Sequence, residues 1–142
     1  MTTSRSLLAL IAGLTLTAPG VASAASPAGM WQTPEDHGLV EVYDCGGKLC
    51  GRIVTSDKLK AQPDLKDAAN KDPALRDRPL KSLVLMRNFD GGPVRWRDGA
   101  IYRPQDGGTY KGSMELVDPN TLKLTGCVVA PLCKTQVWKR VK

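Results

Sequence analysis

The sequence predicts an all-β domain of about eight antiparallel strands with one long charged loop. Short runs of strand-favouring residues alternate with turn-forming residues along most of the chain. This spacing is typical of a β-sandwich or an up-and-down barrel. The four cysteines fall into two close pairs, Cys45/Cys50 and Cys127/Cys133, and each pair brackets a predicted turn.

The first 24 residues have the pattern of an export signal. Arg5 supplies a positive charge, Leu7–Leu16 form an apolar run, and Ala22-Ser23-Ala24 matches a cleavage site. The run is too short for a bilayer span, which needs about 20 residues. We therefore expect cleavage after Ala24. The remaining chain is expected to be a monomer that is periplasmic or secreted and does not span the membrane. One domain, residues 25–142, then remains, with a net charge of +5 instead of +6 because only Arg5 is lost.

The stretch from Val40 to Thr55 predicts a β-hairpin with a glycine-rich centre. A two-residue turn at Gly47-Lys48 satisfies the type II′ preference for glycine in the first position. That register places Cys45 directly opposite Cys50, Val42 opposite Ile53 on the buried face, and Tyr43 opposite Arg52 on the wet face. A directly opposed, non-hydrogen-bonded pair has Cα atoms about 4.5 Å apart, which suits a disulfide.

The cysteines are interpreted as structural disulfides, Cys45–Cys50 and Cys127–Cys133, because an exported chain meets an oxidising compartment. Three connectivities are open, and the two local bridges close the shortest loops. The C-x4-C and C-x5-C spacings lack the C-x2-C arrangement of most zinc sites and of thioredoxin-like redox sites. No metal and no cofactor are expected.

Residues 56–78 form the predicted charged loop. Lysines and arginines alternate with aspartates, large apolar residues are few, and Pro63 and Pro73 interrupt any long helix. One helical turn is predicted at Asp64–Ala69, capped by its aspartate. A loop of this length in a compact domain is usually functional or mobile.

Strand signals resume at Pro79 and continue to the carboxyl terminus. The further predicted strands are Leu80–Phe89, Val94–Trp96 with Ala100–Arg103 as a pair or as one bent strand, Thr109–Val117, Leu122–Val128 and Thr135–Val141, beside a short strand at Met30. Thr109–Val117 alternates with period two, placing Tyr110 and Met114 on one face and Lys111 on the other.

The order of motifs resembles a bacterial envelope family of unknown function, domain of unknown function 2147. The matching pieces span nearly the whole chain after residue 24: Gly29-x-Trp31, the Cys45–Gly51 hairpin, Asn70–Leu80, Gly99–Pro104, Gly108-Thr-Tyr110, Gly126-Cys127 and Thr135–Arg140. Ser82 stands where the family usually has glycine, and Arg103 where it often has Asp or Asn. The resemblance implies a closed, lipocalin-like, eight-stranded up-and-down barrel. In that architecture Trp31 would plug one end, with Arg140 stacked across it.

The function classes can be ranked from the same residues. The only histidine, His37, lies in a polar loop, and no nucleotide-binding or metalloprotease motif occurs, so the sequence favours a binding protein over an enzyme and marks no catalytic residue. An eight-stranded barrel can hold one small ligand. Inward-facing Gly51, Gly112 and Gly126 would leave room beside apolar Met114, Leu116, Leu124 and Ile53, unless these residues simply pack the core.

The ligand is expected to be amphipathic or anionic. The candidate binding residues are Tyr102, Arg103, Tyr110 and Lys111, near an open end at the turns of Asp98–Gly99 and Pro104–Gly108. The alternative is a protein–protein module, an inhibitor or accessory factor of an envelope enzyme, since the positive charge suits an acidic partner. Nucleic acid is not expected, because few aromatic residues are present to stack on bases.

Overall fold

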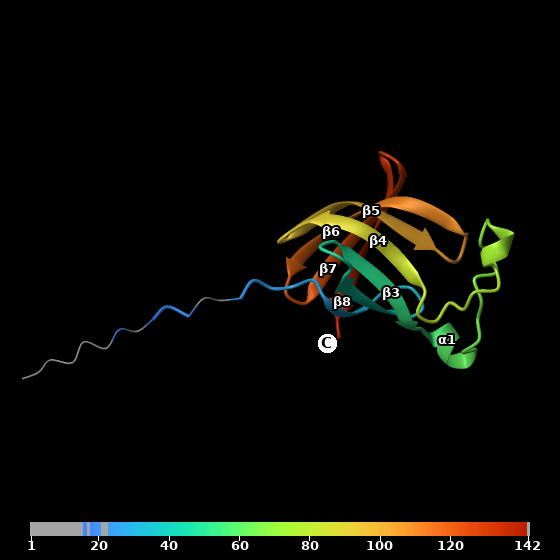
Figure 1. Cartoon of the computed structure of the whole chain (residues 1–142), viewed down its shortest axis with the longest axis horizontal. Coiled ribbons are helices and arrows are strands. Elements are labelled where there is room, and N and C mark those ends of the chain that lie inside the picture. The colour runs from blue at the N-terminus through green and yellow to red at the C-terminus, as the bar shows by residue number, and fades with distance from the viewer. Residues whose placement is uncertain (1–15, 17, 21–22, 142) are drawn as a thin grey trace, which may run out of the picture.

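The computed structural model describes residues 16, 18–20 and 23–141, and its strands form a closed antiparallel barrel in the order β1 to β8 (Figure 1). The predicted export signal falls mostly outside the described residues. The strands are β1 Gly29–Gln32, β2 Leu39–Asp44, β3 Leu49–Thr55, β4 Val84–Gly91, β5 Arg95–Arg103, β6 Gly108–Asp118, β7 Thr121–Val129 and β8 Leu132–Arg140. The predicted all-β, eight-stranded up-and-down barrel is confirmed. Among the described residues, no helix is long and apolar enough to cross a membrane.

The first hairpin forms, but its predicted register is wrong by two residues. Its turn centres on Gly46-Gly47, both with positive φ, and Tyr43 rather than Cys45 lies opposite Cys50. Two glycines together supply the left-handed pair that a tight hairpin favours, whereas Lys48 pays a steric cost there. Cys45 and Cys50 are bridged diagonally, with Cα atoms 5.8 Å apart. The two-residue shift keeps the side-chain faces unchanged, so the buried face was predicted correctly.

The second disulfide joins two directly opposed residues, the geometry that was predicted for the first disulfide. Cys127 on β7 lies directly opposite Cys133 on β8, and their Cα atoms are 4.0 Å apart. Both local bridges are therefore present in the structure.

One end of the barrel is filled by large side chains. The core cluster comprises Trp31, Val40, Val42, Leu49, Met86, Phe89, Trp96, Met114, Leu116, Leu122, Leu124 and Trp138. Trp31 is fully buried and its indole N–H donates to the carbonyl of Pro27 at 2.8 Å. Arg140 lies over this ring and donates to backbone carbonyls of Ser26 (2.6 Å), Ala28 (2.9 Å) and Pro119 (2.6 Å). The amino-terminal segment is thus tied across the β6–β7 end.

β5 is one strand with a bulge, not a turn, at Asp98–Gly99. The register shifts between Trp96 and Gly99, and Asp98 adopts a φ of 58°. A Cβ added at Gly99 would lie 2.5 Å from the Phe89 ring, so the strand can pass over that ring only with glycine there. The bulge lets β5 bend around the core, and neither Asp98 nor Gly99 lines the large pocket of the barrel.

The loop between β3 and β4 is folded and anchored. Helix α1 spans Asp57–Ala61, with Ser56 accepting from the backbone N–H of Leu59 at 3.2 Å, and a 3-10 turn spans Pro73–Leu75. The predicted helical turn at Asp64–Ala69 is wrong. Residues 65–67 are extended instead and pair with residues 78–80, through the Lys66–Pro79 bridge and the bond from the Leu80 N–H to the Leu65 carbonyl.

A buried carboxylate explains this extended segment. Asp67 is fully buried and accepts from the Tyr102 hydroxyl (2.5 Å), the Asn70 amide (2.8 Å) and Arg78 (2.8 Å). The Arg78 guanidinium also lies 5.1 Å from the Tyr102 ring centroid. Burial raises the pKa of Asp67, but these hydrogen bonds and the Arg78 charge outweigh it and lower the pKa below its ordinary value. Asp67 therefore fastens the loop to β5 in its ionised form.

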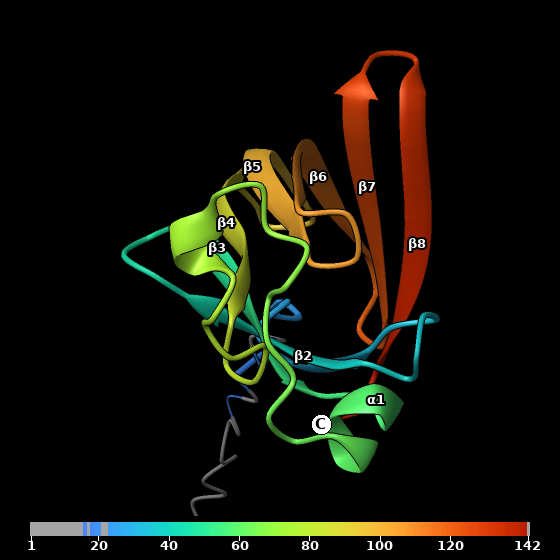
Figure 2. The ribbon, with the colours of Figure 1, turned by 90° about the vertical axis from the view of Figure 1, so that its right-hand side faces the viewer.

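The β7–β8 hairpin reaches beyond the ends of β5 and β6 (Figure 2). Pairing of β7 with β6 begins at Cys127–Lys111, and β8 pairs with β1 only at Arg140–Trp31 and Lys139–Gln32. Because β1 has four residues and β8 has nine, the outer part of this hairpin is a two-stranded arm, which we define as residues 127–133.

Candidate ligand-binding cavity

The other end of the barrel opens into a cavity of about 760 Å³. A drug-sized ligand usually occupies a pocket of roughly 300–1,000 Å³, so the interior is hollow enough to hold one small molecule. The walls are mostly apolar, from the barrel strands, from the β3–β4 loop and from the arm: Leu39, Val40, Ile53, Leu59, Leu65, Leu80, Leu85, Ile101, Leu124, Val128, Pro131, Leu132 and Trp138. The charged loop thus contributes part of the apolar wall.

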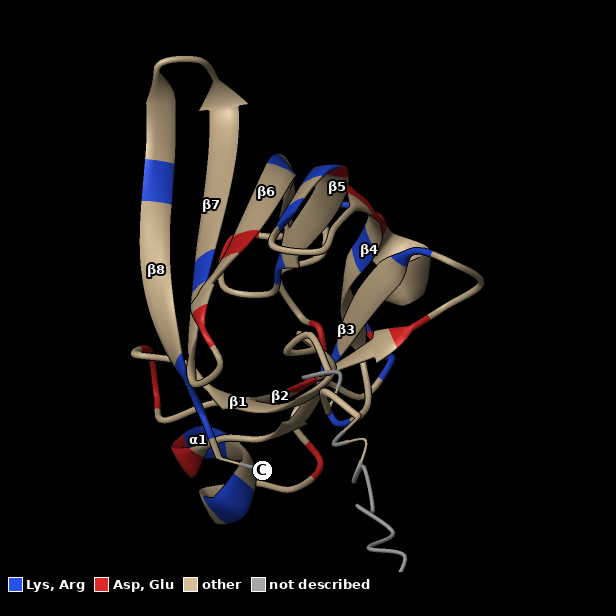
Figure 3. Cartoon of the chain, turned by 90° about the vertical axis from the view of Figure 1, so that its left-hand side faces the viewer, with Lys and Arg blue, Asp and Glu red and all other residues tan. Residues whose placement is uncertain are grey.

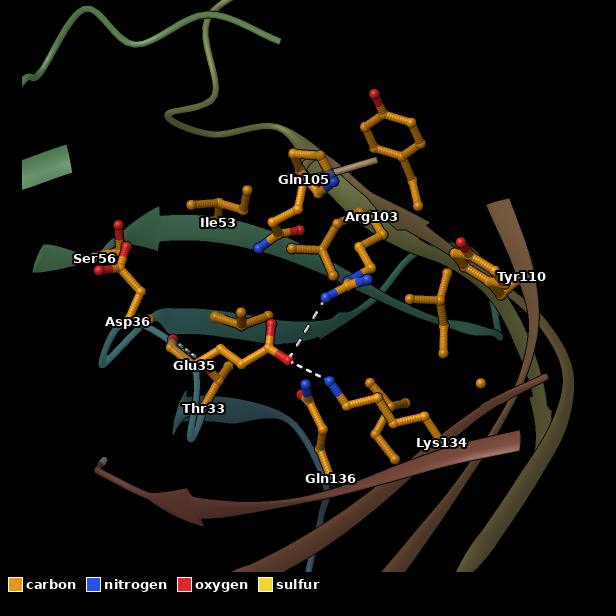
Figure 4. A pocket seen from close by; sticks show the side chains of 18 of the residues that line it. Thr33, Glu35, Asp36, Ile53, Ser56, Arg103, Gln105, Tyr110, Lys134 and Gln136 are labelled. Atoms are coloured by element: carbon orange, nitrogen blue, oxygen red, sulfur yellow. Dashed lines mark hydrogen bonds and ion pairs between the residues drawn. The ribbon is translucent and has the colours of Figure 1, made fainter. Parts of the chain in front are cut away.

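A carboxylate bound by two cations lies at the mouth. Glu35, in the β1–β2 loop, accepts from Lys134 Nζ at 2.6 Å, and Arg103 Nη2 is 3.9 Å from the same oxygen (Figure 4). The hydrogen bond from Lys134 lowers the pKa of Glu35, although burial opposes it, and the Arg103 charge lowers the pKa further. Glu35 is therefore ionised at neutral pH. Three elements distant in sequence meet here: the β1–β2 loop, the end of β5 and β8.

Arg103 and Tyr110, two of the predicted binding residues, both line the cavity and share a second carboxylate. Asp106 accepts from Arg103 Nη1 at 3.1 Å and from the Tyr110 hydroxyl at 2.8 Å. Burial raises the pKa of Asp106, but the hydrogen bonds from Tyr110 and Gly108 outweigh it and lower the pKa. The same bond to Asp106 raises the pKa of Tyr110, so its hydroxyl stays protonated as a donor.

The other two predicted binding residues are placed differently. Tyr102 touches the cavity, but its hydroxyl is already used by Asp67 and Asn70 in the anchor of the loop. Lys111 is exposed on the outer face of β6, opposite Cys127, and is not among the residues lining the cavity. The turn at Pro104–Gly108 does lie at the mouth, as expected, with Pro104 and Gln105 lining it.

Of the three glycines expected to leave room, one does so. A Cβ added at Gly51 would lie 2.8 Å from the Met86 sulfur, and one at Gly112 would lie 2.7 Å from Phe89. These two glycines permit close packing at the filled end. At Gly126, which lines the cavity, the nearest atoms are 3.5 Å away on Ile101 and 3.8 Å away on Tyr110. Leu124 and Ile53 also line the cavity, whereas Met114 and Leu116 belong to the packed core.

The only histidine lies outside the mouth. His37 Nδ1 is 2.6 Å from Asp57 Oδ2, and both side chains are at least half exposed. The hydrogen bond from His37 lowers the pKa of Asp57. Within the described chain, no group of three or more His, Cys, Asp or Glu side chains is placed to hold a metal ion.

Sequence reasoning missed three residues at this site: Glu35, Lys134 and Gln136. The last two could have been found by period-two alternation, because Trp138 faces inward and positions 136 and 134 must then face the same way. Gln136 accepts from the Trp138 indole N–H at 2.9 Å. Glu35 gives no such signal, since its position depends on the fold of a loop.

Comparison with known proteins agrees with the fold. Residues 29–140 match the model of a family described as an uncharacterized protein conserved in bacteria, DUF2147. The structure is similar to that of protein HP1028 from the human pathogen Helicobacter pylori, described as belonging to the lipocalin family. The TM-score is 0.74 at 25% identity, over 81% of this chain and 82% of that chain. No curated protein matches significantly.

Proposed function

The chain belongs to the DUF2147 family of bacterial proteins, and we propose that it is an exported carrier that binds one small amphipathic molecule with an anionic headgroup. The observation that carries this proposal is the cavity of about 760 Å³ in a lipocalin-like barrel, apolar along its walls and polar at its mouth. Apolar walls with a few convergent polar groups are typical of small-molecule sites.

The headgroup would bind where the Glu35 carboxylate now lies. Lys134 and Arg103 converge on one oxygen of Glu35, so a carboxylate or phosphate of the ligand fits the same two donors. The apolar part would lie deeper, against Leu124, Ile53 and the open space at Gly126. Glu35 therefore competes with an anionic ligand for the cations.

Titration calorimetry with laurate and with dodecanol tests this arrangement. We expect Lys134→Ala and Arg103→Ala each to weaken laurate by about 1–3 kcal/mol, the range for hydrogen bonds to charged groups. Glu35→Gln should tighten laurate, because it removes the competing negative charge. Dodecanol, which has the same chain and no charge, should respond little to any of the three substitutions.

Lys111→Ala is the matched control, since it removes a cation of β6 that lies outside the cavity. If laurate affinity falls equally in Lys111→Ala and Arg103→Ala, then the overall positive charge of the protein governs binding, and direct contacts at the cavity mouth do not. If neither laurate nor dodecanol binds the wild-type protein, a carrier of alkyl-chain amphiphiles is excluded.

A filled interior would have removed the ligand-binding proposal and left the alternative, a protein–protein module, in front. The cavity favours the carrier instead. The proposed compartment, periplasmic or secreted, is supported by the two disulfides and by the absence of free cysteines among the described residues.

A further inference from the structure

The tip of the β7–β8 arm consists of five consecutive apolar residues, Val128-Val-Ala-Pro-Leu132. Val128, Val129 and Leu132 are 66%, 61% and 66% exposed, respectively. Tight turns are usually made of Gly, Asn, Asp, Ser and Pro, which suit the backbone conformation of a turn and carry little apolar surface. A turn of this composition exposes apolar side chains together, at the point of the molecule farthest from the neighbouring strands (Figure 2).

The disulfide holds this tip in shape. Cys127 and Cys133 join the two strands where pairing with β6 ends, so the bridge replaces the support that the barrel gives elsewhere. The apolar side chains are thus presented on a covalently closed loop. A preformed surface loses less conformational entropy on binding than a flexible one.

The charge of the hairpin points to an anionic surface. From Pro119 to Val141 the chain has no Asp or Glu, and Lys134 directly follows the arm. Lys123 lies farther down β7, opposite Glu115, and Lys139 and Arg140 lie at the closed end. The projecting tip carries no charge, and the strands below it have basic positions and no acidic ones (Figure 3). Exposed Lys111 lies beside the base of the arm, opposite Cys127.

A lipid surface fits this shape better than a protein does. A stable protein interface buries about 800 Å² on each partner, more than a five-residue tip offers. Shallow insertion into a bilayer interface needs only a few apolar side chains, and nearby lysines add attraction to anionic headgroups.

The tip is also continuous with the cavity. Val128, Pro131 and Leu132 belong both to the tip and to the cavity wall. The tip and the cavity wall therefore share three apolar side chains.

We propose that residues 128–132 insert into the interface of an anionic lipid bilayer, with Lys111 and Lys134, at the base of the arm, near the headgroups. Docking of the empty protein does not require a ligand, so it can succeed or fail independently of the proposed carrier function.

Vesicle flotation tests the proposal with purified, oxidised protein and no added ligand. We expect the wild type to float with phosphatidylglycerol vesicles, to bind phosphatidylcholine vesicles less, and to lose binding as salt rises. Val129→Asp with Leu132→Asp should reduce partitioning at least tenfold. The control is Val94→Asp with Val117→Asp, two residues 52% and 55% exposed away from the arm, which should leave binding unchanged. All variants should unfold at the wild-type urea midpoint, which separates docking from folding.

Position within the bilayer is tested with brominated lipids. The fluorescence of Val129→Trp should be quenched, whereas that of Val117→Trp should not be quenched beyond the background of the three native tryptophans. Absence of vesicle binding by the wild type, or equal losses in the tip and control variants, would overturn the proposal. Binding that depends on charge without quenching at position 129 would also overturn it, because insertion would then be absent.

Discussion

The guanidinium of Arg140 lies 4.3 Å from the centroid of the Trp31 ring, joining the last strand of the barrel to the first. These two residues also face each other in the β1–β8 ladder. The contact is the one that the lipocalin resemblance implied. Arg140 adds three hydrogen bonds to backbone carbonyls, so it closes the barrel end as well as covering the ring.

Trp31→Ala should cost about 3–5 kcal/mol of unfolding free energy, because a fully buried large side chain is removed. Arg140→Ala should cost less, since its guanidinium is only partly buried. A double-mutant cycle followed by urea unfolding should give a coupling of about 0.5–2 kcal/mol, the range of a cation–π contact. Additive losses would mean that the two residues stabilise the barrel end separately. Arg140→Lys, which keeps the charge without the planar fork, should recover only part of the loss.

Asp67→Asn should destabilise the protein by about 3 kcal/mol at pH 7, at the lower end of the range for breaking a buried ion pair, because Arg78 is 30% exposed. The pKa of Asp67 is lowered in the folded state, so its stabilisation is present above the unfolded value of about 3.9. That stabilisation is lost as the pH falls through the folded pKa. Wild type and Asp67→Asn should therefore converge in stability as the pH is lowered from 5 towards 2.

Tyr102→Phe is the control for the Asp67 prediction. It removes one donor from the carboxylate and leaves Arg78 in place, so we expect a loss of about 1–3 kcal/mol. Urea unfolding from pH 2 to pH 7 measures both variants. A difference between wild type and Asp67→Asn that does not change with pH would contradict an ionised anchor.

Gly126→Leu should fill the cavity without harming the fold. The added Cβ meets only ordinary contacts, and the side chain enters open apolar space. We expect unchanged or slightly raised stability, with laurate and dodecanol both weakened at least tenfold. Gly112→Leu is the contrasting variant, because its Cβ would collide with Phe89 and Ile101 and should cost about 1–3 kcal/mol. Unchanged affinity in a stable Gly126→Leu protein would show that ligands do not enter the barrel.

The exported protein should begin at Ala25 and contain no free thiol. Intact mass of the secreted or periplasmic material, before and after treatment with a thiol reagent, measures both properties. A mass that includes residues 1–24 would argue against cleavage, and labelling before reduction would argue against the two bridges.

The barrel could be predicted from the sequence because its strands carry strong local signals: period-two alternation from Thr109 to Val117 and turn residues between strands. The cysteine pairs were also predictable, since each brackets a turn. The hairpin register was not, because Gly46-Gly47 and Gly47-Lys48 both satisfy turn preferences, and only their backbone conformation separates them. Ser82 stands where the family resemblance implies a glycine, and it adopts a φ of 67°, a conformation in which glycine would be free of strain.

The candidate site was only partly predictable. Arg103 and Tyr110 were found because they flank a recognisable turn, and Asp106, which accepts from both, lies in that turn. The pairs that Glu35 and Asp67 form depend on tertiary contacts instead. Glu35 reaches Lys134 across 99 positions in sequence, and Asp67 reaches Tyr102 across 35. No local pattern marks such pairs. The β3–β4 loop was predicted to be charged, but its anchoring depends on the pair of Asp67 and Tyr102, which is distant in sequence.

The shortness of β1 affects the width of ligand that the proposed carrier would admit. Beyond Arg140 and Lys139, no backbone ladder in the described chain joins β8 to β1, and the Glu35–Lys134 pair bridges the remaining seam. The width of the cavity opening is therefore set by an ion pair between side chains. Breaking that ion pair costs little, because partly exposed ion pairs contribute only about 0–1 kcal/mol to stability. For the proposed carrier we therefore expect the seam to widen for a bulkier ligand while the disulfides and the packed end stay unchanged.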